Sequence, residues 1–100
     1  MSIIKKKVYV VGSVRGVHNW QEKFKKYKKH FEDKGYEVKT PLNYPAGKTE
    51  EEYMRLSCTN VLWADVIYVA PESEHSLGTK AEIAIAESCG KSINYIKEFL

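Results

Sequence analysis

Two short apolar runs, each followed by a loop of small residues and a helix-like pattern, constrain the fold of this chain most strongly. The first run is Val8–Val11, followed by Gly12–Gly16. The second run is Val66–Ala70, followed a few residues later by Ser76–Glu82. A near-continuous apolar run is typical of a parallel strand that is buried on both faces. Such sheets bind ligands where loops leave the carboxyl ends of the strands, so both loops are expected at one ligand-binding edge.

Strand and helix patterns alternate along the whole sequence. Strands are expected at residues 6–11, 36–40, 65–70 and 92–95, and helices between residues 19 and 34, 49 and 63, and 79 and 90, with a few helical residues at the end. This alternation predicts a parallel sheet with right-handed crossovers. We therefore predict a single domain over residues 1–100, an α/β three-layer sandwich around a small sheet of four to five parallel strands, flavodoxin-like or Rossmann-like.

Each expected helix begins with the pattern of a capping box, in which a short polar side chain and a Glu three residues later bond to each other's backbone amides. The three pairs are Asn19 with Glu22, Thr49 with Glu52, and Thr79 with Glu82. Glycines at positions 35 and 90 are expected to end two of the helices. Glu82 thus has two interpretations, a helix cap and a functional carboxylate at the ligand-binding edge.

Composition and sequence organisation argue against several classes of protein. No apolar stretch approaches the ~20 residues that span a bilayer, and the first residues lack the order of a secretory signal. A cytoplasmic location and no membrane contact are therefore expected. Cys58 and Cys89 lie far apart without metal-ligand spacing, which favours free thiols in a reducing compartment and no metal site.

Positive charge is concentrated near the start of the chain, where residues 1–39 hold eleven of the 16 lysine and arginine residues. Such a segment is compatible with binding to nucleic acid. However, Trp20, Phe24, Tyr27 and Phe31 recur at the spacing of one helical face. We therefore favour the solvated side of an amphipathic helix over a nucleic-acid-binding surface.

The loop Gly12–Gly16 combines backbone amides, the hydroxyl of Ser13 and the guanidinium of Arg15, a set that suits a phosphate group. It lacks the glycine spacing of a dinucleotide fingerprint and the Gly-Lys-Ser/Thr of a P-loop, which argues against a classical NAD or ATP site. A tight turn between a strand and a helix also needs glycine. A phosphate site and a plain turn with a surface arginine therefore both remain open.

Glu82 and Tyr9 are the candidate reacting and positioning groups at this edge. A glutamate there can attack C1′ of a pentose and form a glycosyl-enzyme ester, as in retaining glycosidases, and Gly78 allows a substrate to approach the backbone. Tyr9 is either a core aromatic or a hydroxyl that orients this carboxylate. Asp65, which begins a strand, is expected at the opposite edge with a structural role. We expect Glu72, Glu74 and His75 to be solvated. His18 lies just past the arginine loop, where it is either a solvated residue or one that approaches a phosphate.

Three segments resemble the nucleoside 2-deoxyribosyltransferase superfamily. They are Val8–Gly16, Ala64–Ile67 and Ser76–Glu82, similar to the family's Y-x-x-G-S-I-R-G opening, its A-D-V-V strand and its S-L-G-x-x-x-E nucleophile motif. The likeness is greatest to the 2′-deoxynucleoside 5′-phosphate N-hydrolases and their short phage and bacterial relatives. The resemblance implies Glu82 as the nucleophile, Tyr9 as its orienting partner, a nucleotide or nucleoside substrate, no cofactor or metal, and a homodimer. It also implies a set of residues that hold the 5′-phosphate: Ser13, Arg15, Gly16, Ser76 and Gly78.

The chain departs from this pattern at Ser57, where the hydrolases have an aspartate that assists the leaving base. A serine is a poor general acid near neutral pH, and loss of an acid–base group typically costs a factor of ~10²–10⁴ in rate. Three interpretations follow: a slow enzyme, an enzyme that uses another group such as Glu74 or His75, or a binding protein without turnover.

The leading functional hypothesis is an N-glycosidase that hydrolyses the base–sugar bond of a (deoxy)nucleoside 5′-monophosphate. If a second base resolves the ester, the same site is a nucleoside 2-deoxyribosyltransferase. Arg15 favours a phosphorylated substrate and hence the hydrolase. A non-catalytic nucleotide-binding module is the alternative from another class, and Ser57 supports it.

Overall fold

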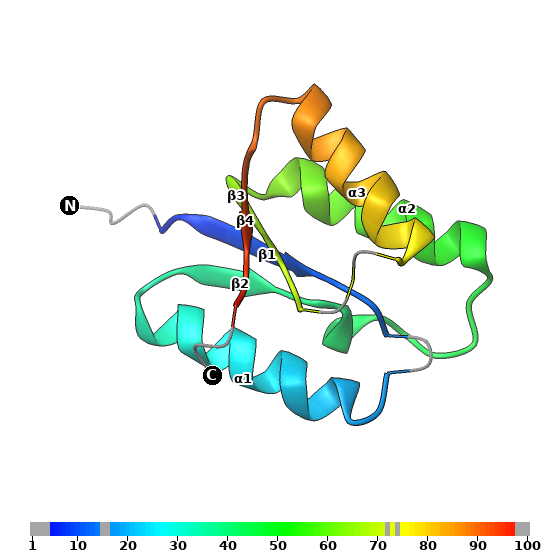
Figure 1. The fold of residues 1–100 in the computed structure, drawn as a ribbon, viewed down its shortest axis with the longest axis horizontal. Coiled ribbons are helices and arrows are strands. Elements are labelled where there is room, and N and C mark those ends of the chain that lie inside the picture. Colours follow the sequence, from blue (N-terminus) through cyan, green and yellow to red (C-terminus); the bar gives the residue numbers. More distant parts are fainter. Residues whose placement is uncertain (1–4, 15–16, 72, 74, 98–100) are drawn as a thin grey trace.

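The computed structural model describes residues 5–14, 17–71, 73 and 75–97, in which strands alternate with helices (Figure 1). In chain order the elements are β1 (Lys7–Val11), α1 (Trp20–Asp33), β2 (Glu37–Lys39), the short 3₁₀ helix η1 (Pro41–Asn43), α2 (Glu50–Trp63), β3 (Val66–Val69), α3 (Leu77–Ser88) and β4 (Ser92–Tyr95). Every predicted strand and longer helix is present, with ends shifted by a few residues at most. The predicted helical residues after β4 are absent at 96 and 97, and the remainder of that prediction lies outside the described residues.

The four strands form one parallel sheet in the order β2-β1-β3-β4. Val8 of β1 lies opposite Val38 of β2 and Val66 of β3, and Ile67 of β3 lies opposite Ile93 of β4. This arrangement confirms the predicted three-layer α/β architecture. Because the strands are parallel, the segments that leave β1, β2 and β3 all emerge at the same edge of the sheet (Figure 1).

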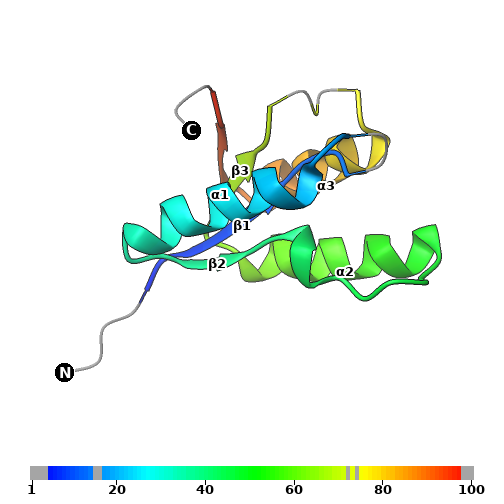
Figure 2. The same cartoon turned by 90° about the horizontal axis from the view of Figure 1, so that it is seen from below.

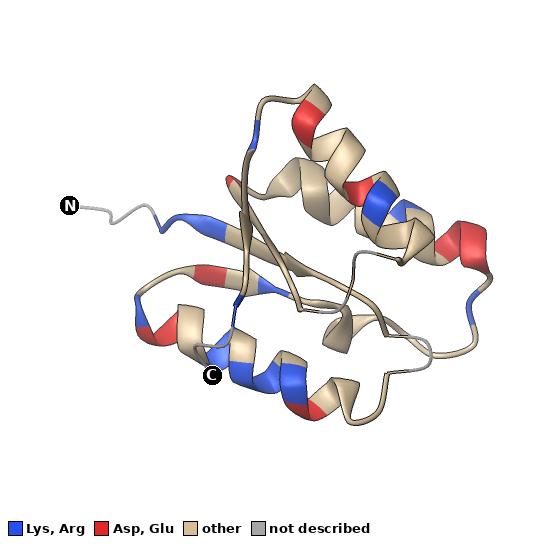
Figure 3. Ribbon diagram, viewed as in Figure 1, with Lys and Arg blue, Asp and Glu red and all other residues tan. Residues whose placement is uncertain are grey.

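Helix α1 covers one face of the sheet, and α2 and α3 cover the other (Figure 1, Figure 2). The buried side of α1 consists of Phe24, Tyr27 and Phe31, which pack in one cluster with Val8 and Val10 of β1. The lysines that gather on α1 lie mostly on its exposed side (Figure 3). The helix is therefore amphipathic, as its aromatic spacing predicts.

Alternate residues of β1 face the second core, on the side of α2 and α3. Tyr9 and Val11 are buried there and share a cluster with Val61 of α2, Ile67 of β3 and Ala86 of α3. Successive side chains of a strand point to opposite faces of the sheet. Tyr9 therefore points away from α1 and toward the two helices that carry the other candidate site residues.

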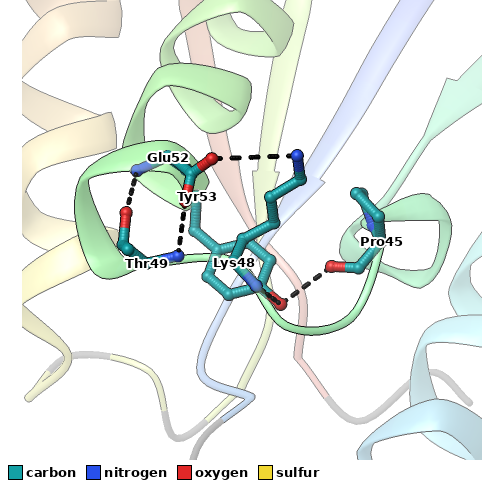
Figure 4. A network of polar contacts seen from close by, with 5 residues as sticks. All are labelled: Pro45, Lys48, Thr49, Glu52 and Tyr53. Carbon is teal, nitrogen blue, oxygen red and sulfur yellow. Dashed lines mark hydrogen bonds and ion pairs between the residues drawn. The ribbon is translucent and has the colours of Figure 1, made fainter.

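The start of α2 has the predicted capping box (Figure 4). The amide of Glu52 donates to Oγ1 of Thr49 over 3.2 Å, and the amide of Thr49 donates to Oε1 of Glu52 over 2.9 Å. The box predicted at Asn19 and Glu22 is wrong. Asn19 has a φ of 58°, in the left-handed region, and its side chain makes no capping bond. A capping side chain normally reaches the helix amides from an extended backbone conformation.

The box predicted at Thr79 and Glu82 is also wrong, because α3 begins earlier. The hydroxyl of Ser76 accepts a hydrogen bond from the amide of Thr79 over 3.2 Å and caps the helix. Thr79 consequently lies inside the first turn. Glu82 lies one turn further along, so its carboxyl group is not used as a cap.

The glycines predicted to end two helices, and the cysteines predicted to be free, are found as expected. Gly35 and Gly90 have φ values of 90° and 68°, which suit the left-handed residue after a helix. Cys58 and Cys89 are free thiols. In the described ranges, no helix is long and apolar enough to cross a membrane, and no group of three or more His, Cys, Asp or Glu side chains is placed to hold a metal ion.

Candidate active site

Five polar side chains meet where β1 faces α2 and α3. They come from β1 (Tyr9), the loop after η1 (Tyr44), α2 (Ser57 and Asn60) and α3 (Glu82). The sequence singled out three of them, namely the tyrosine of β1, the serine of α2 and the glutamate of α3. In the structure the hydroxyl of Tyr44 bonds with Tyr9 and Ser57, and Glu82 interacts with Tyr9.

Glu82 is buried, with 6% of its surface exposed. Its Oε2 atom has no hydrogen-bond partner among the described residues. Burial raises the pKa of the carboxyl group to about 7, while a hydrogen bond with the Tyr9 hydroxyl acts in the opposite direction. A buried carboxyl group that is not fully compensated destabilises the fold, and such groups concentrate at functional sites. The geometry therefore favours a functional carboxylate over a helix cap.

The hydroxyl of Tyr9 lies between Glu82 and Tyr44. Tyr9 is only 1% exposed, and its hydroxyl oxygen is 2.5 Å from that of Tyr44. Burial, and then the negative charge of Glu82, hold the pKa of the Tyr9 phenol well above its usual range. The phenol is therefore protonated at neutral pH and can donate one hydrogen bond. Tyr9 combines both interpretations of the sequence, since it is a core aromatic whose hydroxyl reaches the carboxyl group.

Tyr44 connects Tyr9 to α2. Its hydroxyl is 3.1 Å from Oγ of Ser57 and accepts a hydrogen bond from Nδ2 of Asn60 over 3.1 Å. Sequence reasoning missed both Tyr44 and Asn60. Asn60 follows Ser57 by three residues, and residues at this spacing share one face of a helix, which is a signal that pointed to it. Tyr44 lies in an irregular loop and carries no such signal.

The loop that carries Tyr44 is tied to the first turn of α2 (Figure 4). The hydroxyl of Tyr53 donates to the carbonyl oxygen of Pro45 over 2.8 Å and accepts from the amide of Lys48 over 3.4 Å. The rings of Tyr44 and Tyr53 are stacked, with centroids 6.2 Å apart and planes inclined by 22°. These contacts fix the loop and place the Tyr44 hydroxyl over the Glu82 side of the sheet.

Gly12 and Ser13 join the segments that follow β1 and β3. A Cβ atom on Gly12 would lie 2.6 Å from Cβ of Ala70 and 2.9 Å from Oγ of Ser73, so only glycine fits there. The amide of Ser13 donates to Oγ of Ser73 over 2.9 Å, and Ser73 is buried. Sequence reasoning did not single out Ser73. Because the amide of Ser13 already has a protein partner, a phosphate contact from Ser13 would use its hydroxyl. The predicted sites Arg15 and Gly16 lie outside the described residues.

Ser76 and Gly78 lie at the beginning of α3. The Ser76 hydroxyl is engaged with the amide of Thr79. A Cβ atom on Gly78 would come no closer than 3.8 Å to any neighbouring side chain, the nearest being that of Ser76. Packing among the described residues therefore does not require glycine at position 78, since a Cβ atom there would make ordinary van der Waals contacts. Amides at a helix start favour anions.

The remaining polar candidates take the places expected for structural or solvated residues. Oδ2 of Asp65 accepts from the amide of Lys7 over 2.9 Å, at the edge of the sheet opposite the loops. This confirms its structural role. His75 is exposed, as predicted, and His18 is exposed as well. The predictions for Glu72 and Glu74 fall outside the described residues.

A hollow of about 320 Å³ lies between α3 and the carboxyl ends of β3 and β4. Its wall is mostly apolar and includes Ala70, Ile83 and Tyr95. Glu82 is not part of this wall, so the hollow is separate from the cluster of five polar side chains.

The chain belongs to the family described as "Domain of unknown function (DUF4406)", whose model matches residues 6–95. A comparison with curated proteins found no match.

Two solved structures share the fold. The CMP N-glycosidase BcmB of Clostridium botulinum is 25% identical, with a TM-score of 0.66 over 90% of this chain and 70% of that protein. A 2-deoxyribosyltransferase from Leishmania mexicana is 19% identical, with a TM-score of 0.74 over 91% of this chain, which spans 63% of that protein. Both belong to the nucleoside 2-deoxyribosyltransferase-like superfamily, and the resemblance that the sequence motifs indicated is confirmed.

Proposed function

We propose that this protein is an N-glycosidase that hydrolyses the bond between base and sugar of a (deoxy)nucleoside 5′-monophosphate, with Glu82 as the nucleophile. The observation that carries the proposal is the state of Glu82: it is buried, is not a helix cap, and has one oxygen without a partner among the described residues. The likeness to a CMP N-glycosidase supports the choice of a nucleotide substrate.

The proposed reaction has two steps. The ionised carboxylate of Glu82 attacks C1′, a C–O bond forms, and the bond between C1′ and the base nitrogen breaks, with its electron pair leaving on the base. The base takes up a proton as it leaves. Water then attacks C1′ of the ester, so that the sugar phosphate is released and the carboxylate is restored. Tyr9 donates a hydrogen bond to the carboxyl group and orients it for attack.

The serine at position 57 leads us to expect a slow first step. Its hydroxyl faces Tyr44 rather than a charged group, and a serine hydroxyl does not release its proton near neutral pH. The leaving base must then take its proton from water or from another group, which typically costs a factor of ~10²–10⁴ in rate. We therefore propose a slow enzyme in which Ser57 contacts the substrate without acting as the acid.

The phosphate is proposed to bind at the edge formed by the segments after β1 and β3. Its contacts would come from the hydroxyl of Ser13, the guanidinium of Arg15 and the amides at the start of α3. The full proposed set is Gly12, Ser13, Arg15, Gly16, Ser76 and Gly78, with Gly12 contributing through the close approach to Ala70 and Ser73 that it permits. The proposal includes no cofactor or metal, a homodimer, and a cytoplasmic location.

Two alternatives have support of their own. The likeness to a 2-deoxyribosyltransferase supports transfer of the sugar to a second base through the same ester. The serine at position 57 supports a nucleotide-binding module without turnover.

A base-release assay separates these possibilities. The protein is incubated with each common ribonucleoside and deoxyribonucleoside 5′-monophosphate, with and without a second base, and free base is detected by chromatography. Glu82→Gln removes the nucleophile, and Glu87→Gln, an exposed glutamate of the same helix, is the matched control. Hydrolysis predicts release without an acceptor in the wild type and the control only. Release that needs an acceptor identifies the transferase, and nucleotide binding without release in either condition identifies the binding module.

A further inference from the structure

The Tyr44 hydroxyl has three hydrogen-bond partners but only one hydrogen to donate. It faces Tyr9, Ser57 and Asn60, each at 2.5 to 3.1 Å. A phenol donates one hydrogen bond and accepts two, whereas an amide nitrogen only donates. Asn60 must therefore donate to Tyr44. Of the two remaining partners, Tyr44 accepts from one and donates to the other.

Only two arrangements of protons satisfy this geometry. In the first, Ser57 donates to Tyr44, Tyr44 donates to Tyr9, and the proton of Tyr9 is free to bond with the carboxylate of Glu82. In the second, Tyr9 donates to Tyr44 and Tyr44 donates to Ser57. Tyr9 then has no proton left for Glu82. An ionised carboxylate only accepts hydrogen bonds, so the first arrangement accompanies ionised Glu82 and the second accompanies the protonated form.

We propose that Tyr44 and Asn60 are positioning residues for Glu82, because their hydrogen bonds direct a chain of donors through Tyr9 onto the carboxylate. In the first arrangement every dipole of the chain points its positive end toward the negative charge, and successive donors strengthen one another. The chain also leaves the oxygen of Ser57 free to accept a bond from a substrate hydroxyl while Glu82 is ionised. The catalytic meaning of the chain rests on the proposed function, whereas its effect on the charge of Glu82 does not.

Among the described residues, no charged side chain contributes to the pKa shift of Glu82. β1 contributes Tyr9, the loop after η1 contributes Tyr44, and α2 contributes Ser57 and Asn60, all uncharged at neutral pH. The carboxyl group experiences burial, which raises its pKa, and the bond with Tyr9, which lowers it. Within the described residues, the chain of hydroxyls is thus the stabilising contact of the ionised form.

Two substitutions test the chain directly. Tyr44→Phe removes the donor to Tyr9 and keeps the ring that stacks on Tyr53. Asn60→Asp replaces an obligate donor by an acceptor of nearly the same shape, so Tyr44 must donate to it and turns away from Tyr9. Tyr36→Phe is the matched control, because this half-buried phenol packs in the opposite core beside Phe31.

The measurement is the titration of Glu82 by NMR, in protein with ¹³C-labelled glutamate carboxyl groups. The Glu82 signal is identified as the one that Glu82→Gln lacks. In Asn60→Asp, where Tyr9 donates to Tyr44 instead of Glu82, we expect the midpoint to rise by about one pH unit, the size of one charge-assisted hydrogen bond. In Tyr44→Phe, Tyr9 keeps its bond to Glu82 and loses only the reinforcement from Tyr44, so we expect a smaller rise of roughly a few tenths of a pH unit. The control should keep the wild-type midpoint. An unchanged or lowered midpoint in either variant, with a folded spectrum, overturns the proposal. The titration needs no turnover, so a failed base-release assay leaves this test intact.

Discussion

Replacing Glu82 by glutamine should stabilise the protein at high pH. The carboxyl group has a pKa of about 7 in the folded protein, against an ordinary value of 4.5. Below pH 4.5 it is protonated in both the folded and the unfolded chain and has no effect on stability. Between pH 4.5 and 7 the unfolded chain releases this proton while the folded chain keeps it. The free energy of unfolding therefore falls as the pH rises through this window, and then levels off.

The size of this loss follows from the two pKa values. A pKa difference of one unit corresponds to about 1.4 kcal/mol. The difference between 7 and 4.5 therefore lowers the free energy of unfolding of the wild type by about 3 kcal/mol above pH 7. A glutamine at position 82 keeps the shape of the protonated group and does not titrate. The free energy of unfolding of Glu82→Gln, relative to that of the wild type, should therefore rise by about 3 kcal/mol between pH 4 and pH 8.

Urea denaturation of Glu82→Gln, the wild type and Glu87→Gln at pH 4, 6 and 8 measures the effect. Glu87 is exposed on the same helix, so its variant should follow the pH dependence of the wild type. If the difference in unfolding free energy between Glu82→Gln and the wild type is the same at pH 4 and pH 8, the pKa of Glu82 is not raised by folding.

Four further substitutions test the packing around the site by urea denaturation. Gly12→Ala should lower the free energy of unfolding by about 1–3 kcal/mol, because its Cβ would lie 2.6 Å from that of Ala70. Gly78→Ala should not lower it, and equal losses in the two variants would contradict this difference in packing. Thr49→Ala should cost about 1 kcal/mol through loss of the cap, and an unchanged stability would refute that role. Tyr53→Phe should cost about 0.5–1.5 kcal/mol by freeing the loop at Pro45, and no cost would mean the loop is held otherwise.

The fold could be predicted from the sequence because its signals are local and repeated. Val8–Val11 and Val66–Val69 are apolar throughout, as buried parallel strands must be. The aromatic stripe of α1 fixes which side of that helix is buried. Helix starts were predicted less well, since Ser76 and Thr79 are both good capping residues and the sequence does not show which one the chain uses.

The candidate site could be predicted only in part. Glu82 and Tyr9 could be singled out by their places beside the ligand-binding edge and by the family motifs, and Ser57 only by the resemblance to the hydrolases. Tyr44 enters the site because Tyr53 holds its loop against α2, which is a tertiary contact without a sequence pattern. Ser73 was missed for the same reason, since its bond to the amide of Ser13 joins two segments that are 60 residues apart.

The most direct test of the central claim is to trap the glycosyl-enzyme ester. The protein is incubated with 2′-deoxy-2′-fluoroarabinonucleoside 5′-monophosphates, in which fluorine slows hydrolysis of the ester, and is then digested and mapped by mass spectrometry. We expect a sugar-phosphate adduct on the Glu82 carboxyl group in the wild type and in Glu87→Gln, and none in Glu82→Gln. An adduct on another residue, or release of base without any adduct at Glu82, would contradict it.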